Sequence, residues 1–251
     1  MTNPSPHRHG SETTQPKVAV TGANGALGEA LLCRWHERGA HLIALSTSVE
    51  PLTLCDALGQ PIPLRQVCWQ AGREVELQEV LEDIDVLVIN HGVNVRDERS
   101  ASAAEISLEV NALSSWRLME LFAAVVRTRS VEESRPRPEV WVNTSEAEIQ
   151  PALSPLYEIS KRLLGQLLSL RALDLASSLR IRRLVLGPFR STLNPHGVMD
   201  PHWVAGQIMR QASWDWGLIV VTINPFTYIA MPLASVGRWI YFKLFSRSLR
   251  P

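Results

Sequence analysis

Segments with the pattern of buried strands alternate with segments of helical spacing along this sequence of 251 residues, and this alternation restricts its fold most. The predicted strands are apolar runs at residues 17–22, 41–47, 65–70, 85–92, 140–145, 179–189 and 217–223. Helices are predicted between them at residues 26–40, 74–84, 102–126, 154–177 and 200–212. Strands that are apolar on both faces need helices on both sides of their sheet. We therefore expect an α/β fold, a Rossmann-type doubly wound parallel sheet of about seven strands.

One domain is expected from residue 17 to residue 251. Residues 1–16 are rich in Pro, Ser, Thr and His, which predicts a disordered tail without a secretory signal. Residues 224–251 form an apolar, aromatic segment with three interpretations: a pocket lining that packs on a partner subunit, an amphipathic helix in a membrane interface, or plain core. Pro232 and Arg238 interrupt it, which argues against a transmembrane span.

Charge and cysteine content exclude several classes of protein. The formal net charge is zero, so the chain lacks the basic balance of a nucleic-acid-binding protein. Cys33, Cys55 and Cys68 have no paired spacing and are odd in number, which indicates a reducing, cytoplasmic location. They follow no metal-ligand pattern, so no metal site is predicted.

A glycine-rich turn, "TGANGALG", follows the first predicted strand and opens the first helix. Glycines three residues apart let backbone amides approach a pyrophosphate, and the helix N-terminus adds partial positive charge. The turn therefore predicts dinucleotide binding. Its candidate residues are Gly22, Ala23, Asn24, Gly25, Ala26, Leu27 and Gly28.

The end of the second strand bears on which nicotinamide would bind. A carboxylate there would bind the ribose hydroxyls and repel a 2′-phosphate, but the sequence has Ser46 and Thr47 instead. Their hydroxyls are candidate phosphate ligands, and Arg65 or Arg73 would have to supply positive charge. We expect NADP(H) rather than NAD(H).

A tyrosine and a lysine stand four residues apart in the long helix that begins at residue 154. Only three of the 25 basic residues are lysines, and Lys161 is one of them. Ser154 and Pro155 suit the cap and first turn of the helix, which places Tyr157 and Lys161 on one face. A nearby ammonium is expected to lower the pKa of the phenol, so Tyr157 is the predicted general acid.

Together these motifs resemble the short-chain dehydrogenase/reductase family over residues 17–192. "INHG" is similar to its Asn-Asn-Ala-Gly turn, with Asn90 and Gly92 kept and His91 in place of alanine. "VNTS" and "YEISK" resemble the catalytic serine and Tyr-x-x-x-Lys, and "LGPFRST" a Pro-Gly-x-x-x-Thr stretch with its first two residues exchanged, at Pro188. The family often has an adenine-binding acid where Trp69 and Gln70 stand here.

The resemblance implies roles for individual residues. Ser145 would orient the substrate oxygen, with Thr144 as the alternative because the usual spacing reaches that residue. Lys161 would also hold the nicotinamide ribose, and Asn111 would continue a proton relay through its backbone and a water. Asn90, Gly92 and Pro188 would line the cofactor, together with Tyr157 and Lys161 themselves.

The expected function is an oxidoreductase that interconverts a carbonyl and an alcohol, on a lipophilic small-molecule substrate. The rivals are a catalytically silent NAD(P)-binding sensor or assembly factor, and an epimerase or lyase that uses the cofactor transiently. "GPFRSTLNPHGV" and "VTINPFTYIAMP" more loosely resemble the dehydrogenase part of proteins described as bifunctional sterol desaturase/short-chain dehydrogenases. We expect a cytoplasmic homo-oligomer without nucleic acid, with peripheral membrane contact through residues 225–247 as a further option.

Overall fold

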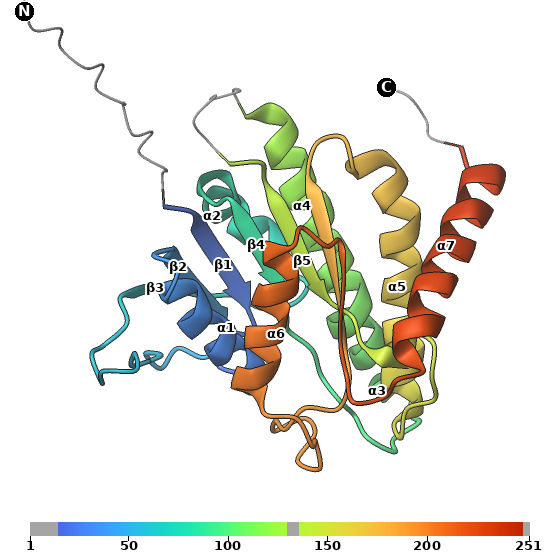
Figure 1. The fold of residues 1–251 in the computed structure, drawn as a ribbon, viewed down its shortest axis with the longest axis horizontal. Coiled ribbons are helices and arrows are strands. Elements are labelled where there is room, and N and C mark those ends of the chain that lie inside the picture. The colour runs from blue at the N-terminus through green and yellow to red at the C-terminus, as the bar shows by residue number, and fades with distance from the viewer. Residues whose placement is uncertain (1–14, 130–135, 248–251) are drawn as a thin grey trace, which may run out of the picture.

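The computed structural model describes residues 15–129 and 136–247. Within these ranges seven strands form one sheet in the order β3-β2-β1-β4-β5-β6-β7, and every neighbouring pair is parallel (Figure 1). The strands are β1 (Lys17–Thr21), β2 (His41–Ser46), β3 (Leu64–Cys68), β4 (Val86–Ile89), β5 (Glu139–Asn143), β6 (Arg180–Leu186) and β7 (Leu218–Val221). The predicted fold is therefore confirmed.

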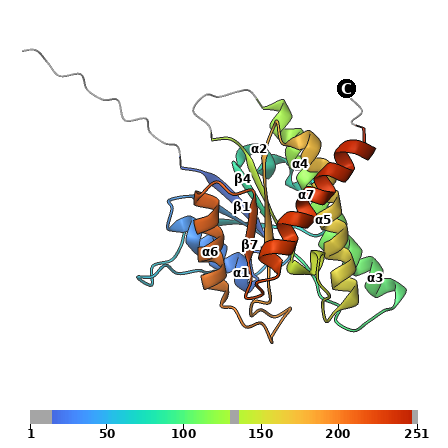
Figure 2. The ribbon, with the colours of Figure 1, turned by 45° about the vertical axis from the view of Figure 1, so that its right-hand side comes forward.

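Helices cover both faces of the sheet. They are α1 (Ala26–His36), η1 (Glu74–Leu77), α2 (Gln78–Asp83), α3 (Ala101–Leu108), η2 (Glu109–Leu113), α4 (Ser114–Thr128), η3 (Glu146–Glu148), α5 (Pro155–Leu175), α6 (Pro201–Ser213) and α7 (Thr227–Phe245). Helices α1 and α6 lie together on one face, and α2, α4 and α5 lie on the other (Figures 1 and 2). Helix α7 packs on the outside of α5.

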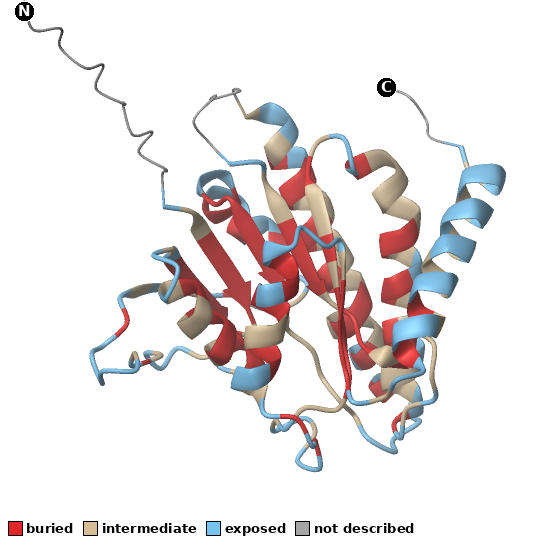
Figure 3. Cartoon of the chain, in the orientation of Figure 1, coloured by how far each residue is buried: buried red, intermediate tan, exposed pale blue. Residues whose placement is uncertain are grey.

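Each strand contributes to two hydrophobic cores, which explains the continuous apolar runs. Val18 and Val20 face the core beneath α1 and α6, whereas Ala19 between them faces the core beneath α2, α4 and α5. Buried residues accordingly fill the middle of the sheet and the inner sides of these helices (Figure 3). The core holds the strand ends in place, and those ends carry the candidate site.

The order of the strands reverses beside β1. The chain moves from β1 to β2 and β3 on one side, then returns to β4 on the other side of β1. Ligands of open α/β sheets bind at such a switch point, outside the carboxyl ends of the strands. The glycine turn follows β1, and Asn90 to Gly92 follow β4, so both flank the switch point.

Two predicted helices differ from the structure, and two predictions lie outside it. The helix expected over 102–126 is divided by the π-helical turn η2, and that expected over 74–84 begins as the 3-10 turn η1. Residues 1–14 of the tail predicted at residues 1–16 lie outside the described residues, as do residues 130–135 of the charged loop before β5.

Candidate functional site

The glycine turn between β1 and α1 needs its glycines for steric reasons. Gly22 has a φ of 62°, which glycine adopts freely, and a Cβ there would lie 2.9 Å from the Cα of His91. A Cβ on Gly28 would lie 2.2 Å from the carbonyl oxygen of Gly22. Gly25 is the N-cap of α1 and has no side chain to cap its first amides. The N-terminus of α1 therefore has no side-chain cap. Binding of a pyrophosphate by residues 22–28 stays a prediction.

Hydrogen bonds join the end of β1 to the ends of β4 and β5. The Thr21 hydroxyl accepts from the backbone N–H groups of Asn90 at 2.8 Å and His91 at 3.2 Å. The Asn90 side chain accepts in turn from Asn143 Nδ2 at 2.9 Å. Asn143 was not among the predicted site residues, although it lies in the "VNTS" stretch that pointed to the serine. These bonds fix the floor of the site across three strands.

His91 lies between the glycine turn and β3. Its Nδ1 is 2.9 Å from the Thr21 hydroxyl, and its ring meets the buried Trp69 edge-on with centroids 5.2 Å apart. Burial lowers the pKa of His91 to about 3, and the charge of Lys161 acts in the same direction. His91 is therefore neutral at physiological pH, next to the position where an adenine-binding acid was expected and Trp69 stands instead.

Ser145 is the hydroxyl that the fold brings to Tyr157. The Ser145 hydroxyl lies near enough to the Tyr157 phenol to act on its pKa, which it lowers. The Ser145 Oγ also accepts from the Ala147 N–H at 3.1 Å, which caps η3. Thr144 is fully buried, and its hydroxyl points back to the Leu184 carbonyl at 3.3 Å. The Ser145 hydroxyl also donates to the carbonyl of Leu186 at 3.5 Å, but of the two candidates it is Ser145 that acts on the pKa of Tyr157.

Tyr157 lies in the first turn of α5 and Lys161 one turn later, as the spacing predicted. The Lys161 ammonium lies 5.6 Å from the centre of the Tyr157 ring and donates to the Asn143 carbonyl at 3.0 Å. Burial lowers the pKa of Lys161 to about 8, while the Glu148 carboxylate acts in the opposite direction.

The predicted lowering of the tyrosine pKa is wrong for the protein without cofactor. Burial raises the pKa of Tyr157, and the Ser145 hydroxyl opposes this effect. The ammonium of Lys161 approaches the ring of Tyr157, whereas the largest influence on the phenol is the loss of water around it. Tyr157 therefore holds its proton at neutral pH.

Asn111 lies in the π-helical turn η2, which separates α3 from α4. Its side chain bonds both backbone groups of Val93: Oδ1 accepts from N at 2.7 Å, and Nδ2 donates to O at 2.9 Å. Nδ2 also donates to the Ser160 hydroxyl at 3.0 Å. Gly92 lies close to the same side chain, because a Cβ on Gly92 would be 3.1 Å from the Asn111 Oδ1. The side chain thus holds the segment after β4; the proton relay through its backbone stays a prediction.

The end of β2 is only partly available to a cofactor. Ser46 is buried, and its hydroxyl accepts from a backbone N–H two residues later at 2.9 Å, whereas Thr47 is exposed. The two arginines expected to reach this end are placed elsewhere. Arg73 pairs with Glu76, and Arg65 is the second residue of β3, toward the opposite edge of the sheet. The geometry therefore supplies hydroxyls but neither of these cations.

Pro188 follows the end of β6 and anchors the loop that leads to α6. Its carbonyl accepts from the N–H groups of Val198 at 2.9 Å and Met199 at 3.2 Å. Asn94, from the segment after β4, donates to the carbonyl of Leu193 in the same loop at 3.5 Å. The loop after Pro188 therefore contacts the segment that follows the Asn90 turn.

The helix caps were predicted with mixed success. Asp200 caps α6, the helix predicted at residues 200–212, by accepting from the Trp203 N–H at 2.9 Å. Ser154 is the N-cap residue of α5, but its hydroxyl donates to the Arg96 carbonyl at 2.6 Å and does not cap the helix. The side chain that was predicted to start the helix instead fixes the loop after β4.

A buried ion cluster beneath the site was missed. The Glu148 carboxylate, in the turn after Ser145, lies 2.6 Å from Arg238 Nη1 of α7 and 3.6 Å from Arg183 Nη1 of β6. Its side chain is fully buried, and a Cβ on Gly165 of α5 would lie 2.0 Å from its Oε2. The only sequence signal was an arginine inside the apolar segment 224–251.

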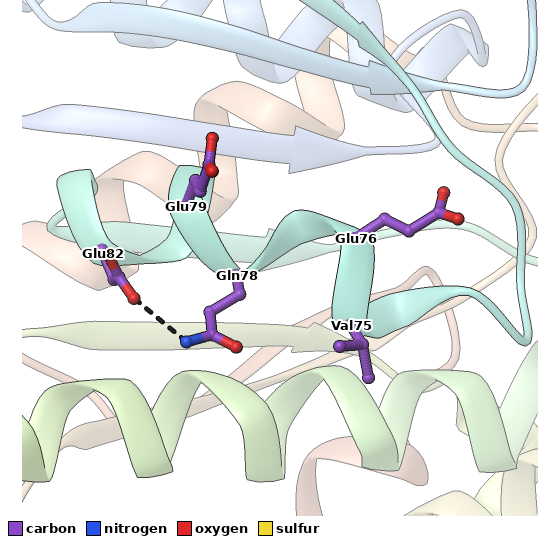
Figure 4. Close-up of a pocket in the computed structure, with 5 residues that line it drawn as sticks. All are labelled: Val75, Glu76, Gln78, Glu79 and Glu82. Atoms are coloured by element: carbon purple, nitrogen blue, oxygen red, sulfur yellow. Dashed lines mark hydrogen bonds between the residues drawn. The ribbon is translucent and has the colours of Figure 1, made fainter.

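A surface hollow elsewhere on the molecule has no part in this site. It measures about 490 Å³ and is lined by Val75, Glu76, Gln78, Glu79 and Glu82 on η1 and α2. Its acidic side chains diverge from one another, and the one bond drawn joins Gln78 Nε2 to Glu82 Oε1 at 3.2 Å (Figure 4). Three carboxylates would repel an anionic dinucleotide. Across residues 15–129 and 136–247, no group of three or more His, Cys, Asp or Glu is placed to hold a metal ion.

Comparison with known proteins gives one relative that aligns over most of this chain. Monoglucosyldiacylglycerol epimerase of Synechocystis sp. is 47% identical over 231 residues, which are 92% of this chain and 55% of that protein. The chain spans about half the length of the curated relatives it matches. A comparison with models of protein families found no match.

Solved structures match the fold over nearly their whole length. A short-chain dehydrogenase from Burkholderia cenocepacia in complex with NADP has a TM-score of 0.70 at 19% identity, over 93% of this chain and 98% of that one. A 4-hydroxyisoleucine dehydrogenase complexed with NADH has a TM-score of 0.67 at 18% identity, over 84% and 97%. The chain has the fold of the short-chain dehydrogenases.

Proposed function

We propose that the chain is a short-chain dehydrogenase/reductase that interconverts a secondary alcohol and a carbonyl with a nicotinamide cofactor. One observation carries the proposal: Ser145, Tyr157 and Lys161 meet at the sheet edge that also bears the open glycine turn. When bound, the nicotinamide would accept or supply the hydride. Residues 22–28, Asn90 and Gly92 would hold it, because they line the switch point beside β1.

The side chains then have distinct tasks. Tyr157 keeps its proton at neutral pH, so it donates that proton to a carbonyl oxygen and recovers it from an alcohol in the reverse direction. Ser145 orients the same oxygen through a hydrogen bond. Lys161, with a pKa of about 8, supplies positive charge beside the ring, and Asn143 fixes its position.

The relative suggests the substrate and the type of turnover. We propose a glycosyl diacylglycerol as substrate, on the strength of 47% identity to a protein named monoglucosyldiacylglycerol epimerase. Inversion at a sugar carbon would need two steps. The bound nicotinamide would take the hydride from the C–H bond, and the hydroxyl proton would pass to the deprotonated form of Tyr157, which leaves a ketone. The raised pKa of Tyr157 makes this form the minor one at neutral pH. The hydride then returns to the opposite face and the proton to the oxygen, so no net oxidation occurs.

NADP(H) remains the proposed cofactor, supported by the absence of an acid at the end of β2 and by the exposed Thr47 hydroxyl. Titration of the protein with NADPH and with NADH would decide between them. A tighter Kd for NADH would contradict the preference. The looser resemblance to sterol desaturase fusions stays an untested prediction.

Activity is tested with the purified chain, NADP⁺ and a glucosyl diacylglycerol in detergent micelles. We expect an isomeric glycolipid, separable by chromatography, while the total amount of oxidised cofactor stays constant. Substrate deuterated at the inverted carbon should keep its label, because the hydride returns to the carbon that it left. Tyr157→Phe should abolish the product. If the wild type binds cofactor yet neither isomerises this lipid nor reduces any carbonyl, the silent sensor becomes the better account.

A further inference from the structure

Helix α7 carries an apolar stripe on the side that faces away from the protein. Its members are spaced four, three, four and four residues apart, so they lie on one helix face. They are Ile229, Leu233, Val236, Ile240 and Leu244, exposed to between 46% and 71%. Most of the helix is exposed in Figure 3. A stripe of this length indicates that another apolar surface covers it.

The opposite stripe of α7 already faces the protein, so the outer one is not its core-facing side. Thr227 and Met231 are buried there, and Arg238 reaches Glu148. Helix α7 lies along α5 with this side inward (Figure 2). The helix is therefore apolar on its outer face while its inner face is anchored by a buried ion pair.

The charges and rings of α7 match a lipid surface. The sequence from residue 224 to residue 251 contains no acidic residue. Lys243 lies over the ring of Trp239 at 4.6 Å. Tyr241 and Phe245, which contact each other, are exposed elsewhere around the last turns of the helix. Cations, exposed aromatic rings and an aliphatic stripe together are typical of helices that lie in the interface of an anionic bilayer. A second copy of the chain packed against α7 would bring the cations of the two α7 helices together, and neither helix has an acidic residue to balance them.

A spanning role does not fit the same segment. Over the described residues, no helix combines the length and apolar character that crossing a membrane requires. Pro232 and Arg238 lie within α7, and Arg238 is tied to the protein. The helix is therefore suited to lie on a bilayer rather than to cross it.

The first residue of α7 and the segment just before it are hydrogen-bonded to the turn that follows Ser145. Glu146 accepts hydrogen bonds from Thr222 at 2.7 Å and from Thr227 at 3.2 Å. Asn224 donates to Gln150 at 2.6 Å. The N-terminal end of α7 therefore lies at the catalytic edge of the sheet, as Figure 1 also shows. A bilayer against α7 would lie beside the entrance to the site.

We propose that α7 docks on a bilayer surface that contains anionic lipid and presents the catalytic edge to a lipid substrate held there. The link to substrate rests on the proposed function, whereas the docking surface rests on α7 alone.

Vesicle cosedimentation of the full chain tests the docking. Vesicles of phosphatidylcholine with phosphatidylglycerol should bind the wild type, and Leu233→Ser/Leu244→Ser should weaken partitioning by about tenfold or more. Lys243→Glu should weaken binding to the anionic vesicles about tenfold but leave binding to pure phosphatidylcholine unchanged. The matched control is Leu58→Ser/Val75→Ser, which changes two exposed apolar residues away from α7, at 84% and 73% exposure. The control should bind like the wild type.

Thermal unfolding and NADPH binding confirm that each variant is folded. The docking proposal is overturned if the wild type does not bind anionic vesicles, or if the α7 double variant binds as well as the control. It is also overturned if that variant turns a dimer into a monomer in sedimentation equilibrium with vesicle binding unchanged. Turnover of micellar substrate without vesicle binding would overturn only the proposal that α7 docks on a bilayer. Vesicle binding without turnover would overturn only the proposed function.

Discussion

Replacement of Gly165 by alanine should destabilise the protein, although alanine normally favours a helix. Gly165 lies within α5, where alanine would usually add about 0.5–1 kcal/mol of stability. Here the new Cβ would lie 2.0 Å from Glu148 Oε2 and 2.4 Å from its Cδ, far inside contact distance. Glu148 would have to leave its buried ion pairs with Arg183 and Arg238.

The magnitude follows from these opposing effects. Loss of one partner of a buried ion pair costs about 3–5 kcal/mol, and the gain in helix propensity offsets about 1 kcal/mol of this. We therefore expect the free energy of unfolding to fall by about 2–4 kcal/mol in Gly165→Ala, measured by urea denaturation with circular dichroism. The matched control is Gly237→Ala in α7, where a Cβ would meet nothing within 4 Å. The control should be as stable as the wild type or slightly more so. A Gly165→Ala protein at least as stable as the wild type would refute the claim that the buried ion pairs of Glu148 with Arg183 and Arg238 stabilise the fold.

Three further changes probe the groups around the site. Lys161 has a pKa of about 8 in the folded protein and an ordinary pKa of 10.5, so the unfolded chain binds more protons between these pH values. In urea titrations, the free energy of unfolding of the wild type should therefore rise from pH 8 to pH 10.5 relative to that of Lys161→Met. If the two proteins show the same dependence of stability on pH, the lowered pKa of buried Lys161 is contradicted. Asn111→Ala leaves both backbone groups of Val93 without their partner and should cost about 1–3 kcal/mol by the same assay, where a loss below a few tenths would count against the role. Thr21→Val removes the acceptor of the Asn90 N–H, so the free energy of NADPH binding should fall by more than the folding stability that the melting temperature reports. Unchanged NADPH binding in a calorimetric titration would show that Thr21 does not hold the Asn90 turn in its binding geometry.

The fold was predictable because its signal is local. Each strand has two buried faces, so an apolar run such as residues 86–89 identifies it without knowledge of its neighbours. The parallel order then brings the strand ends to one edge, which predicts that Ser145 lies at the edge with the glycine turn. Spacing along one helix likewise places Lys161 on the same face as Tyr157.

The features that were missed depend on partners distant in sequence. Glu148 and Arg238 are ninety residues apart, and the reason for Gly165 appears only when their ion pair is in place. The π-helical turn at Asn111 accommodates its bonds to Val93, which helical spacing does not reveal. The pKa of Tyr157 rises because the fold removes water from it, an effect that packing alone determines.

A single-turnover measurement of hydride transfer tests the central claim most directly. NADPH carrying deuterium at the transferred position would be mixed with excess enzyme and a carbonyl substrate, and label in the alcohol followed by mass spectrometry. We expect transfer by the wild type, and by Tyr157→Phe a rate lower by about 10²–10⁴ with an unchanged Kd for NADPH. Equal rates in the two proteins, or no binding of either nicotinamide by the wild type, would contradict it.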